Sequence, residues 1–200
     1  MILLAIDQST NKNGWAIITD KGVLLGSGMQ DFSNAKERYE VRISHVKRWV
    51  IKMLQEHRPD VVGIEEVPPT PGKAMTVLSN LFGVLENTLL ERGENYLVIP
   101  AGTWRADIGL KANLEVTCPE CGAKLQRITS AHIWKCSKMN LETFKAKHGK
   151  HSLERDERTA LKEASMAHVK ERFGRECGDD EADAICLALY MLHRINLQQK

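Results

Sequence analysis

Four carboxylates stand at positions where folding could bring them together. Asp7 and Glu65 each directly follow an apolar run. Asp180 and Asp183 lie three residues apart near the start of an apolar stretch, so one side of a helix would carry both. Singly, Asp7 could cap a turn, Glu65 could be half exposed at a strand end, and Asp180 could favour a helix N-terminus through the dipole. Asp183 has Ala and Ile neighbours, and burying a carboxylate there is costly unless a cation meets it.

A group of four carboxylates indicates one kind of chemistry. The charges repel and raise each other's pKa, and Mg²⁺ or Mn²⁺, which prefer carboxylate and water oxygens, relieve that repulsion. Two such ions about 3.5–4 Å apart can stabilise the attacking and leaving oxygens of a phosphodiester displacement, one by activating water and the other at the departing 3′ oxygen. The sequence therefore predicts a phosphodiester hydrolase. The four acids that could form such a site are Asp7, Glu65, Asp180 and Asp183.

Two acids adjoin this set. Glu66 follows Glu65, and the alternation of side chains along a strand turns it to the opposite side. Asp179 precedes Asp180 at a position suited to capping a helix. We expect neither to bind the metal.

Hydrophobic periodicity predicts the elements that position the acids. Apolar runs separated by turn residues predict five strands, of which the first three form an antiparallel meander. Apolar spacings of three and four predict helices. This order predicts an α/β fold with a mixed five-stranded sheet and helices on both faces. The expected strands are 2–6, 15–19, 23–28, 61–64 and 96–99, and the expected helices are 34–57, 73–92, 154–173 and a last one from about 179.

A change of composition marks an insertion. Between residues 113 and 152 cysteines appear, hydrophobicity falls and lysines become frequent. We expect a discontinuous domain, 1–112 and 153–200, interrupted by a small module at 113–152. In this module Cys118-Pro-Glu-Cys121-Gly is typical of a zinc knuckle, and the segment ending at Cys136 resembles the return strand of a zinc ribbon. The three cysteines therefore predict a structural zinc site.

The fourth ligand of that site is open. A complete ribbon would have a cysteine three residues after Cys136, but the residue there is Met139, a poor zinc ligand. His132 could share a metal with Cys136 if the two lie one helical turn apart; in a strand they would be too far apart. His148 or His151 could then reach back. The alternative is a degenerate ribbon held by packing alone.

Three segments carry a resemblance to a known family. Ile6–Thr10 with Asn13–Ala16 resembles the first strand and turn of RuvC-type Holliday-junction resolvases. Ile64–Val67 resembles their second acidic motif, and Asp180–Ile185 is similar to their closing helix with its Asp-x-x-Asp. The resemblance covers about residues 1–112 and 153–196. It implies an RNase H-like fold, two Mg²⁺ or Mn²⁺ ions on the four acids, branched DNA such as a four-way junction as substrate, and a homodimer that makes paired incisions.

The chain departs from this family in two places. After the second acid the family carries an aromatic wedge that opens the junction, whereas residues 68–72 are Pro-Pro-Thr-Pro-Gly. The family core also has no cysteine module. We therefore expect a different way of opening the junction and a looser preference for DNA sequence.

Basic and aromatic residues could contact DNA. Lys162 is a candidate phosphate contact, with a solvent-exposed helix position as the equal alternative. Trp104 and Trp134 could stack on bases, although core packing is the usual role of such residues. The helix expected at 73–92 is a candidate dimer interface, and its apolar stripe could instead belong to the core. Lysines in the insertion would bind phosphates without reading sequence: Lys145, Lys147 and Lys150.

Composition sets outer limits on function. Of the 200 residues, 42% are hydrophobic and 27% charged, and the net charge of +2 excludes a strong polycation. No apolar run is long enough for a membrane span, and the N-terminus is a poor signal peptide, so we expect a cytoplasmic protein of a bacterial or virus-infected cell. Two other functions stay open: a nuclease for RNA–DNA hybrids or flaps, and a non-catalytic nucleic-acid-binding zinc protein, which would have no reason to keep four acids.

Overall fold

The computed structural model describes residues 1–34, 36–67, 72–110, 117–118, 120–128, 133–140, 142–143 and 152–198. The chain divides into two compact units. The first comprises Met1–Leu110 and Ser165–Lys200, and the second comprises Lys111–Ala164. In the described part of the chain, no helix is both long and apolar enough to cross a membrane.

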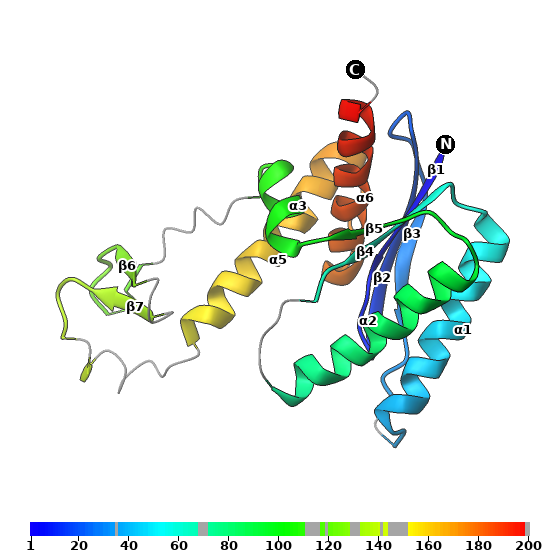
Figure 1. Ribbon diagram of the computed structural model, residues 1–200. Helices are drawn as coiled ribbons and strands as arrows, with labels where there is room; N and C mark the ends of the chain where they lie inside the picture. Colours follow the sequence, from blue (N-terminus) through cyan, green and yellow to red (C-terminus); the bar gives the residue numbers. More distant parts are fainter. Residues whose placement is uncertain are drawn as a thin grey trace. The chain divides into compact units, whose positions relative to one another are not determined.

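The first unit is built on a mixed five-stranded sheet in the order β3-β2-β1-β4-β5 (Figure 1). The first three strands form an antiparallel meander, and β4 and β5 add to it in parallel. Strands β1 and β4 therefore lie side by side with their carboxyl ends at the same edge. The strands are β1 (Ile2–Asp7), β2 (Lys12–Thr19), β3 (Leu24–Asp31), β4 (Val61–Glu65) and β5 (Tyr96–Ile99).

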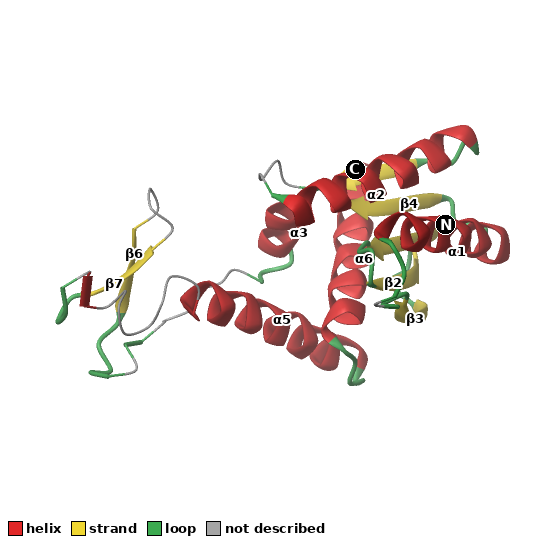
Figure 2. Cartoon of the chain, turned by 90° about the horizontal axis from the view of Figure 1, so that it is seen from below, coloured by secondary structure: helices red, strands yellow, loops and turns green. Residues whose placement is uncertain are grey.

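Helices cover both faces of this sheet (Figures 1 and 2). One face packs against α1 (Tyr39–His57) and α2 (Lys73–Glu91), and the other against α6 (Asp179–Gln198), which crosses β1 and β2. Leu4 and Ile6 belong to the α1–α2 core, so the alternating Leu3 and Ala5 face α6. All four are fully buried, which explains why β1 is a continuous apolar run. The predicted mixed sheet with helices on both faces is confirmed.

The structure describes two further helices. The short helix α3 (Ala101–Asp107) follows β5 directly, with Pro100 at its N-cap position. The helix α5 (Ser152–Phe173) precedes α6. The sequence predicted α5 and α6 within two residues of their observed starts, but it did not predict α3.

The second unit contains a small antiparallel pair of strands, β6 (Leu125–Ile128) and β7 (Ile133–Cys136). A bridge between Thr117 and Lys124 extends the pair. Cys118, Leu125 and Cys136 form the buried centre of this unit. A small cysteine-bearing insertion, as expected from the sequence, fits these features.

The bounds of three elements differ from those expected. Helix α1 begins at Tyr39, five residues after Asn34, because Asn34 accepts a hydrogen bond from the Lys36 N–H and offers the backbone a turn in place of a helix. Strand β2 begins three residues earlier than Trp15, and β3 runs on to Asp31. The α2 positions Leu81, Leu85 and Leu89 are buried in the core, so core packing accounts for the apolar stripe of that helix.

Candidate active site

Asp7 and Glu65 stand at the ends of neighbouring parallel strands. Ile6 pairs with Ile64 in the β1–β4 register, so the two acids follow at the same edge of the sheet. The side chain of Gln8 fixes this junction. Its amide donates a hydrogen bond to the Glu65 carbonyl, and its Oε1 accepts one from the Glu65 N–H at 3.0 Å. A buried side chain thus continues the pairing of the two strands beyond their ends.

Helix α6 brings the other two acids to this edge. Its first turn contains Asp180, and Asp183 follows with only 6% of its surface exposed. The helix lies against Gly14, the residue that pairs with Asp7 in the β1–β2 register. A β-carbon built on Gly14 would stand 1.8 Å from the Asp180 carbonyl oxygen. Only glycine therefore allows α6 to approach β2 this closely.

A polar network holds the start of α6 from the other side. Arg175, in the loop before the helix, donates to Glu181 Oε1 at 2.7 Å and to Ser27 Oγ on β3 at 2.9 Å. Ser27 also donates to Glu181 Oε1 at 2.7 Å. The three groups form a closed triangle that ties the α5–α6 loop, the first turn of α6 and β3 together.

The electrostatics show that the four acids share one environment. Burial raises the pKa of Asp7 well above its usual range, and the charges of Glu65, Asp183 and Asp180 raise it further, in that order. Burial also raises the pKa of Glu65, although Arg105 and a hydrogen bond from Trp104 oppose the rise. In the metal-free protein the pKa values of both carboxyl groups are therefore raised, mainly by burial.

Two residues of α3 hold the carboxylates. Trp104 donates its indole N–H to Glu65 Oε1 at 3.2 Å, and Arg105 donates to Asp183 Oδ2 at 3.0 Å. The guanidinium of Arg105 also lies 4.4 Å from the Trp104 ring centroid. Trp104 is 1% exposed, so it packs in the core and stacks on no base. The sequence did not single out Arg105 or Gln8. For Arg105 a signal existed, because residues after β5 share the sheet edge where the parallel strands end.

The site fits hard divalent cations. Among the described residues, Arg105 is the cation that pairs with these four carboxylates, which leaves an excess of negative charge that Mg²⁺ or Mn²⁺ would neutralise. Asp183 Oδ2 is taken by Arg105, but Oδ1 is buried without a hydrogen-bond partner among the residues that the structure describes. Such an oxygen is expensive to bury unless a cation or donor meets it. The carboxylate could thus bind a metal through Oδ1 while keeping its contact with Arg105.

Replacing Arg105 by Gln is expected to destabilise the metal-free protein and to enlarge the stabilisation that Mg²⁺ confers. The change leaves buried Asp183 without a counter-ion, which should lower the free energy of unfolding by about 1–3 kcal/mol. A bound cation would restore part of that stability. Thermal unfolding in EDTA and in MgCl₂ measures both effects. Arg38→Gln is the control, since its ion pair with Glu40 is exposed and contributes little. An equal Mg²⁺-induced rise in Tm for wild type and Arg105→Gln would contradict this role.

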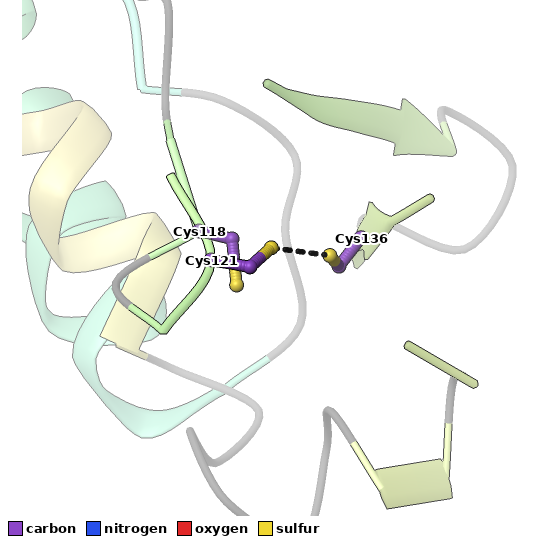
Figure 3. Close-up of side chains that lie close together, drawn as sticks. All are labelled: Cys118, Cys121 and Cys136. Atoms are coloured by element: carbon purple, nitrogen blue, oxygen red, sulfur yellow. Dashed lines mark hydrogen bonds between the residues drawn. The ribbon is translucent and has the colours of Figure 1, made fainter. Parts of the chain in front are cut away.

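The cysteines of the second unit form a separate cluster (Figure 3). The sulfur atoms of Cys118, Cys121 and Cys136 all lie within 4.8 Å of one another. Cys118 and Cys136 are buried, and Cys121 is exposed. Hydrogen bonds from the backbone N–H groups of Glu120 and Cys121 lower the pKa of the Cys118 thiol, which favours the thiolate that a metal requires. The predicted trio is thus brought together.

The structure describes some of the other candidate residues, and also a cysteine outside the cluster, Cys186. Lys162 is described and half-buried on α5, where it has an interaction partner. Cys186 is a packing residue of α6, and burial raises the pKa of its thiol to about 12. The side chain of Trp134 is not described. Several other residues lie outside the described ranges: Lys145, Lys147, Lys150, His132, His148, His151 and the segment 68–71 of the proline-rich loop.

Comparison with known proteins gives matches by structure. No family model matches the sequence, and no curated protein matches it. The chain is similar to RuvC of Thermus thermophilus, both in complex with a Holliday junction substrate (TM-score 0.64, 14% identity, 98% of this chain and 96% of that chain) and as RuvC alone (TM-score 0.59, 15% identity, 99% and 97%). It is also similar to the yeast mitochondrial Holliday junction resolvase Ydc2 (TM-score 0.51, 12% identity, 98% and 80%).

These matches agree with the resemblance carried by the three acidic motifs. They extend over nearly the whole of the chain and nearly the whole of each RuvC chain. In this chain the site described above lies on β1, β4 and the last described helix, α6. The chain has the RNase H-like fold of the RuvC-type Holliday junction resolvases.

Proposed function

We propose that this protein is a metal-dependent endonuclease that resolves four-way DNA junctions by paired incision. The observation that supports the proposal is the placement of the acids: Asp7 and Glu65 end neighbouring parallel strands, and Asp180 and Asp183 lie at the start of α6, which packs against β2 at Gly14, the partner of Asp7. The structural neighbours add the substrate class, because one of them is a RuvC in complex with a Holliday junction. The nuclease domain would comprise residues 1–112 and 153–200, with 113–152 inserted.

In this proposal Asp7, Glu65, Asp180 and Asp183 hold two Mg²⁺ or Mn²⁺ ions. Such ions supply an activated water and charge stabilisation for hydrolysis of a phosphodiester. The protein's own part is to place the acids: Gln8 aligns the two strand ends, and Trp104 holds one oxygen of Glu65. Because these supports are themselves buried, the ligands would be in place before DNA binds.

We propose a homodimer, because a four-way junction has two-fold symmetry and paired cuts need two active sites. The basic residues of the insertion and of α5 would contact phosphates, which carry no sequence information. Binding should therefore depend on junction shape and weaken steeply with salt. The residues proposed for this role are Lys145, Lys147, Lys150 and Lys162.

We also propose that Cys118, Cys121 and Cys136 bind a structural zinc ion. Zinc–sulfur bonds of about 2.3 Å in a tetrahedron place the sulfur atoms roughly 3.8 Å apart. Cys121 Sγ and Cys136 Sγ are 3.6 Å apart, and neither cysteine is in a disulfide. This separation is close to the one expected around zinc, and all three sulfur atoms lie within 4.8 Å of one another.

A cleavage assay tests the nuclease proposal. Purified protein with Mg²⁺ or Mn²⁺ should convert a fixed four-way junction, labelled on each strand in turn, into two nicked duplexes with cuts at symmetric positions. Flap, plain duplex and RNA–DNA hybrid are run in parallel, and some cutting of other branched DNA is expected. Unpaired nicks, or cutting confined to the RNA strand of the hybrid, would instead support a different RNase H-like nuclease. Binding of all these substrates with no cleavage would support a non-catalytic protein.

A further inference from the structure

A surface pocket of about 440 Å³ lies between the β1–β2 turn and the first turns of α1 and α2. Later residues of α2 give it an apolar side. Its polar lining consists of two cationic side chains and three side chains with hydroxyl groups, all in the first unit. These are Ser9 and Thr10 from the turn, Tyr39 and Arg42 from α1, and Lys73 from α2.

Hydrogen bonds hold the β1–β2 turn in place. Asn13 Oδ1 accepts the Ser9 N–H at 3.0 Å, and Ser9 Oγ accepts the Asn11 N–H at 3.1 Å. The Asn11 carbonyl in turn accepts the Phe32 N–H at 2.6 Å, which ties the turn to the end of β3. Because the Ser9 hydroxyl serves as an acceptor within the turn, its own hydrogen can be donated to a group in the pocket.

The two cations reach the pocket from different helices. Arg42 is half-buried on α1 with its Nε shielded from water, and Lys73 is the exposed first residue of α2. The guanidinium presents a fork of N–H donors that matches the oxygens of a phosphate, and the lysine adds a mobile point charge. Arginine, lysine and hydroxyl side chains are the groups with which proteins hold nucleic-acid phosphates. The lining therefore fits a phosphate group.

The chain connects this pocket directly to the acids. Thr10 is three residues after Asp7, which limits the distance between their α-carbons to about 11 Å. Lys73 begins the helix that follows β4 and Glu65. The pocket thus lies close to the acids, yet its own lining has the opposite charge. A phosphate bound there would be a neighbour of the phosphate that the acids and their metal ions attack.

We propose that this pocket binds a backbone phosphate of the DNA strand that is cut, next to the scissile phosphate. The inference rests on the proposed nuclease function, which supplies the DNA. Arg42 and Lys73 would offset the repulsion between the four acids and the strand. Holding a second phosphate would also restrict how the strand turns about the first, and such orientation contributes to rate. No bond is made or broken in the pocket itself.

Neutralising single phosphates tests the inference. Four-way junctions are prepared with one uncharged methylphosphonate at each successive position of one strand, and binding is measured in Ca²⁺, which is expected to support binding without cutting. The full-length protein is prepared as wild type, Arg42→Gln, Lys73→Gln and the double variant. Arg48→Gln and Lys52→Gln are the controls, because they remove the same charges from exposed positions further along α1. The cut positions are mapped in parallel with Mg²⁺.

One phosphate next to the cut should depend on both cations. Arg42→Gln and Lys73→Gln should each weaken junction binding about tenfold, the effect of one charge-assisted hydrogen bond. Each should also reduce the slope of log K against log salt by up to about 0.9. Methylphosphonate at that position should weaken binding by wild type, cost less in either single variant and cost nothing in the double variant, because the contact is then already lost. The two controls should keep the wild-type profile.

The outcomes separate this inference from the nuclease proposal. Cleavage by wild type, with no phosphate whose effect depends on Arg42 or Lys73, would overturn the inference alone. A dependent phosphate far from the cut would contradict its placement beside the scissile phosphate. A dependent phosphate in a protein that binds junctions without cutting them would support the pocket as a DNA contact and overturn the nuclease proposal. If Arg42→Gln fails to fold, Lys73→Gln still decides, since Lys73 is exposed.

Discussion

Replacement of Asp7 by Asn is expected to abolish junction cleavage and, in the absence of metal, to stabilise the protein. The loss of activity should be at least ~1,000-fold, because a ligand of the ions that stabilise the transition state is removed. Junction binding should persist, since phosphate contacts elsewhere on the protein are unchanged. Calcium should likewise support binding without cutting, because its looser coordination positions the nucleophile poorly.

The gain in stability follows from the raised pKa of Asp7. Burial and the charges of Glu65, Asp183 and Asp180 raise this pKa in the folded state above its unfolded value. The folded protein therefore binds a proton that the unfolded chain has released, and the stability of the metal-free protein falls as pH rises from the unfolded to the folded pKa. Asn carries no charge, so the advantage of Asp7→Asn should be absent at acidic pH and greatest above the folded pKa.

Thermal unfolding in EDTA across this pH range measures the effect. Each kcal/mol gained should raise Tm by about 2–4 °C in a chain of this size. Added Mg²⁺ should raise the Tm of the wild type and not that of Asp7→Asn. The pair Glu65→Gln and Glu66→Gln provides a matched control, because Glu66 is the next residue but its side chain is exposed. Wild-type cleavage by Asp7→Asn, or equal loss in both glutamate variants, would refute the assignment of the site.

The positions of the acids could be predicted because they depend on local pattern. An apolar run that ends in an acid places that acid at the end of a buried strand, and parallel pairing of β1 with β4 brings Asp7 next to Glu65. The spacing of Asp180 and Asp183 is a property of a single helix. The pairing of β1 with β4, by contrast, joins distant segments and is known from the structure.

The contacts that support the acids could not be predicted, because each joins segments far apart in the chain; the only signal was the position of Arg105 just after β5. Arg105 meets Asp183 across 78 positions, and Gln8 meets Glu65 across 57. Helix α3, which carries both Arg105 and Trp104, has seven residues, too few for apolar periodicity to show. The sequence indicated that Trp104 packs in the core, and the structure shows it buried there. Its indole N–H also donates a hydrogen bond to Glu65.

Replacement of Gly14 by Ala is expected to reduce cleavage by about 100-fold although Gly14 bears no functional group. Its β-carbon would lie 1.8 Å from the Asp180 carbonyl oxygen, whereas real contacts of this kind are at least 3.0 Å. The obstacle is backbone, so α6 must move by more than 1 Å and carry Asp180 and Asp183 with it. A displacement of about 1 Å within a catalytic site can cost about 100-fold in rate. Overpacking should also cost about 1–3 kcal/mol of stability.

Two other glycines separate displacement of the helix from loss of glycine as such. Gly83 in α2 has open space around it, so Gly83→Ala should leave cleavage unchanged and raise stability by up to about 1 kcal/mol. A β-carbon on Gly63 would meet Met191 Sδ at 2.3 Å, but a flexible side chain can move where a helix backbone cannot. Gly63→Ala should therefore lower Tm while largely preserving cleavage.

Cleavage by Gly14→Ala at the wild-type rate would mean that the start of α6 does not set the position of the acids. Loss of cleavage in Gly14→Ala at a temperature where circular dichroism shows it folded, with cleavage retained in Gly63→Ala, would locate the requirement at the contact between β2 and the first turn of α6.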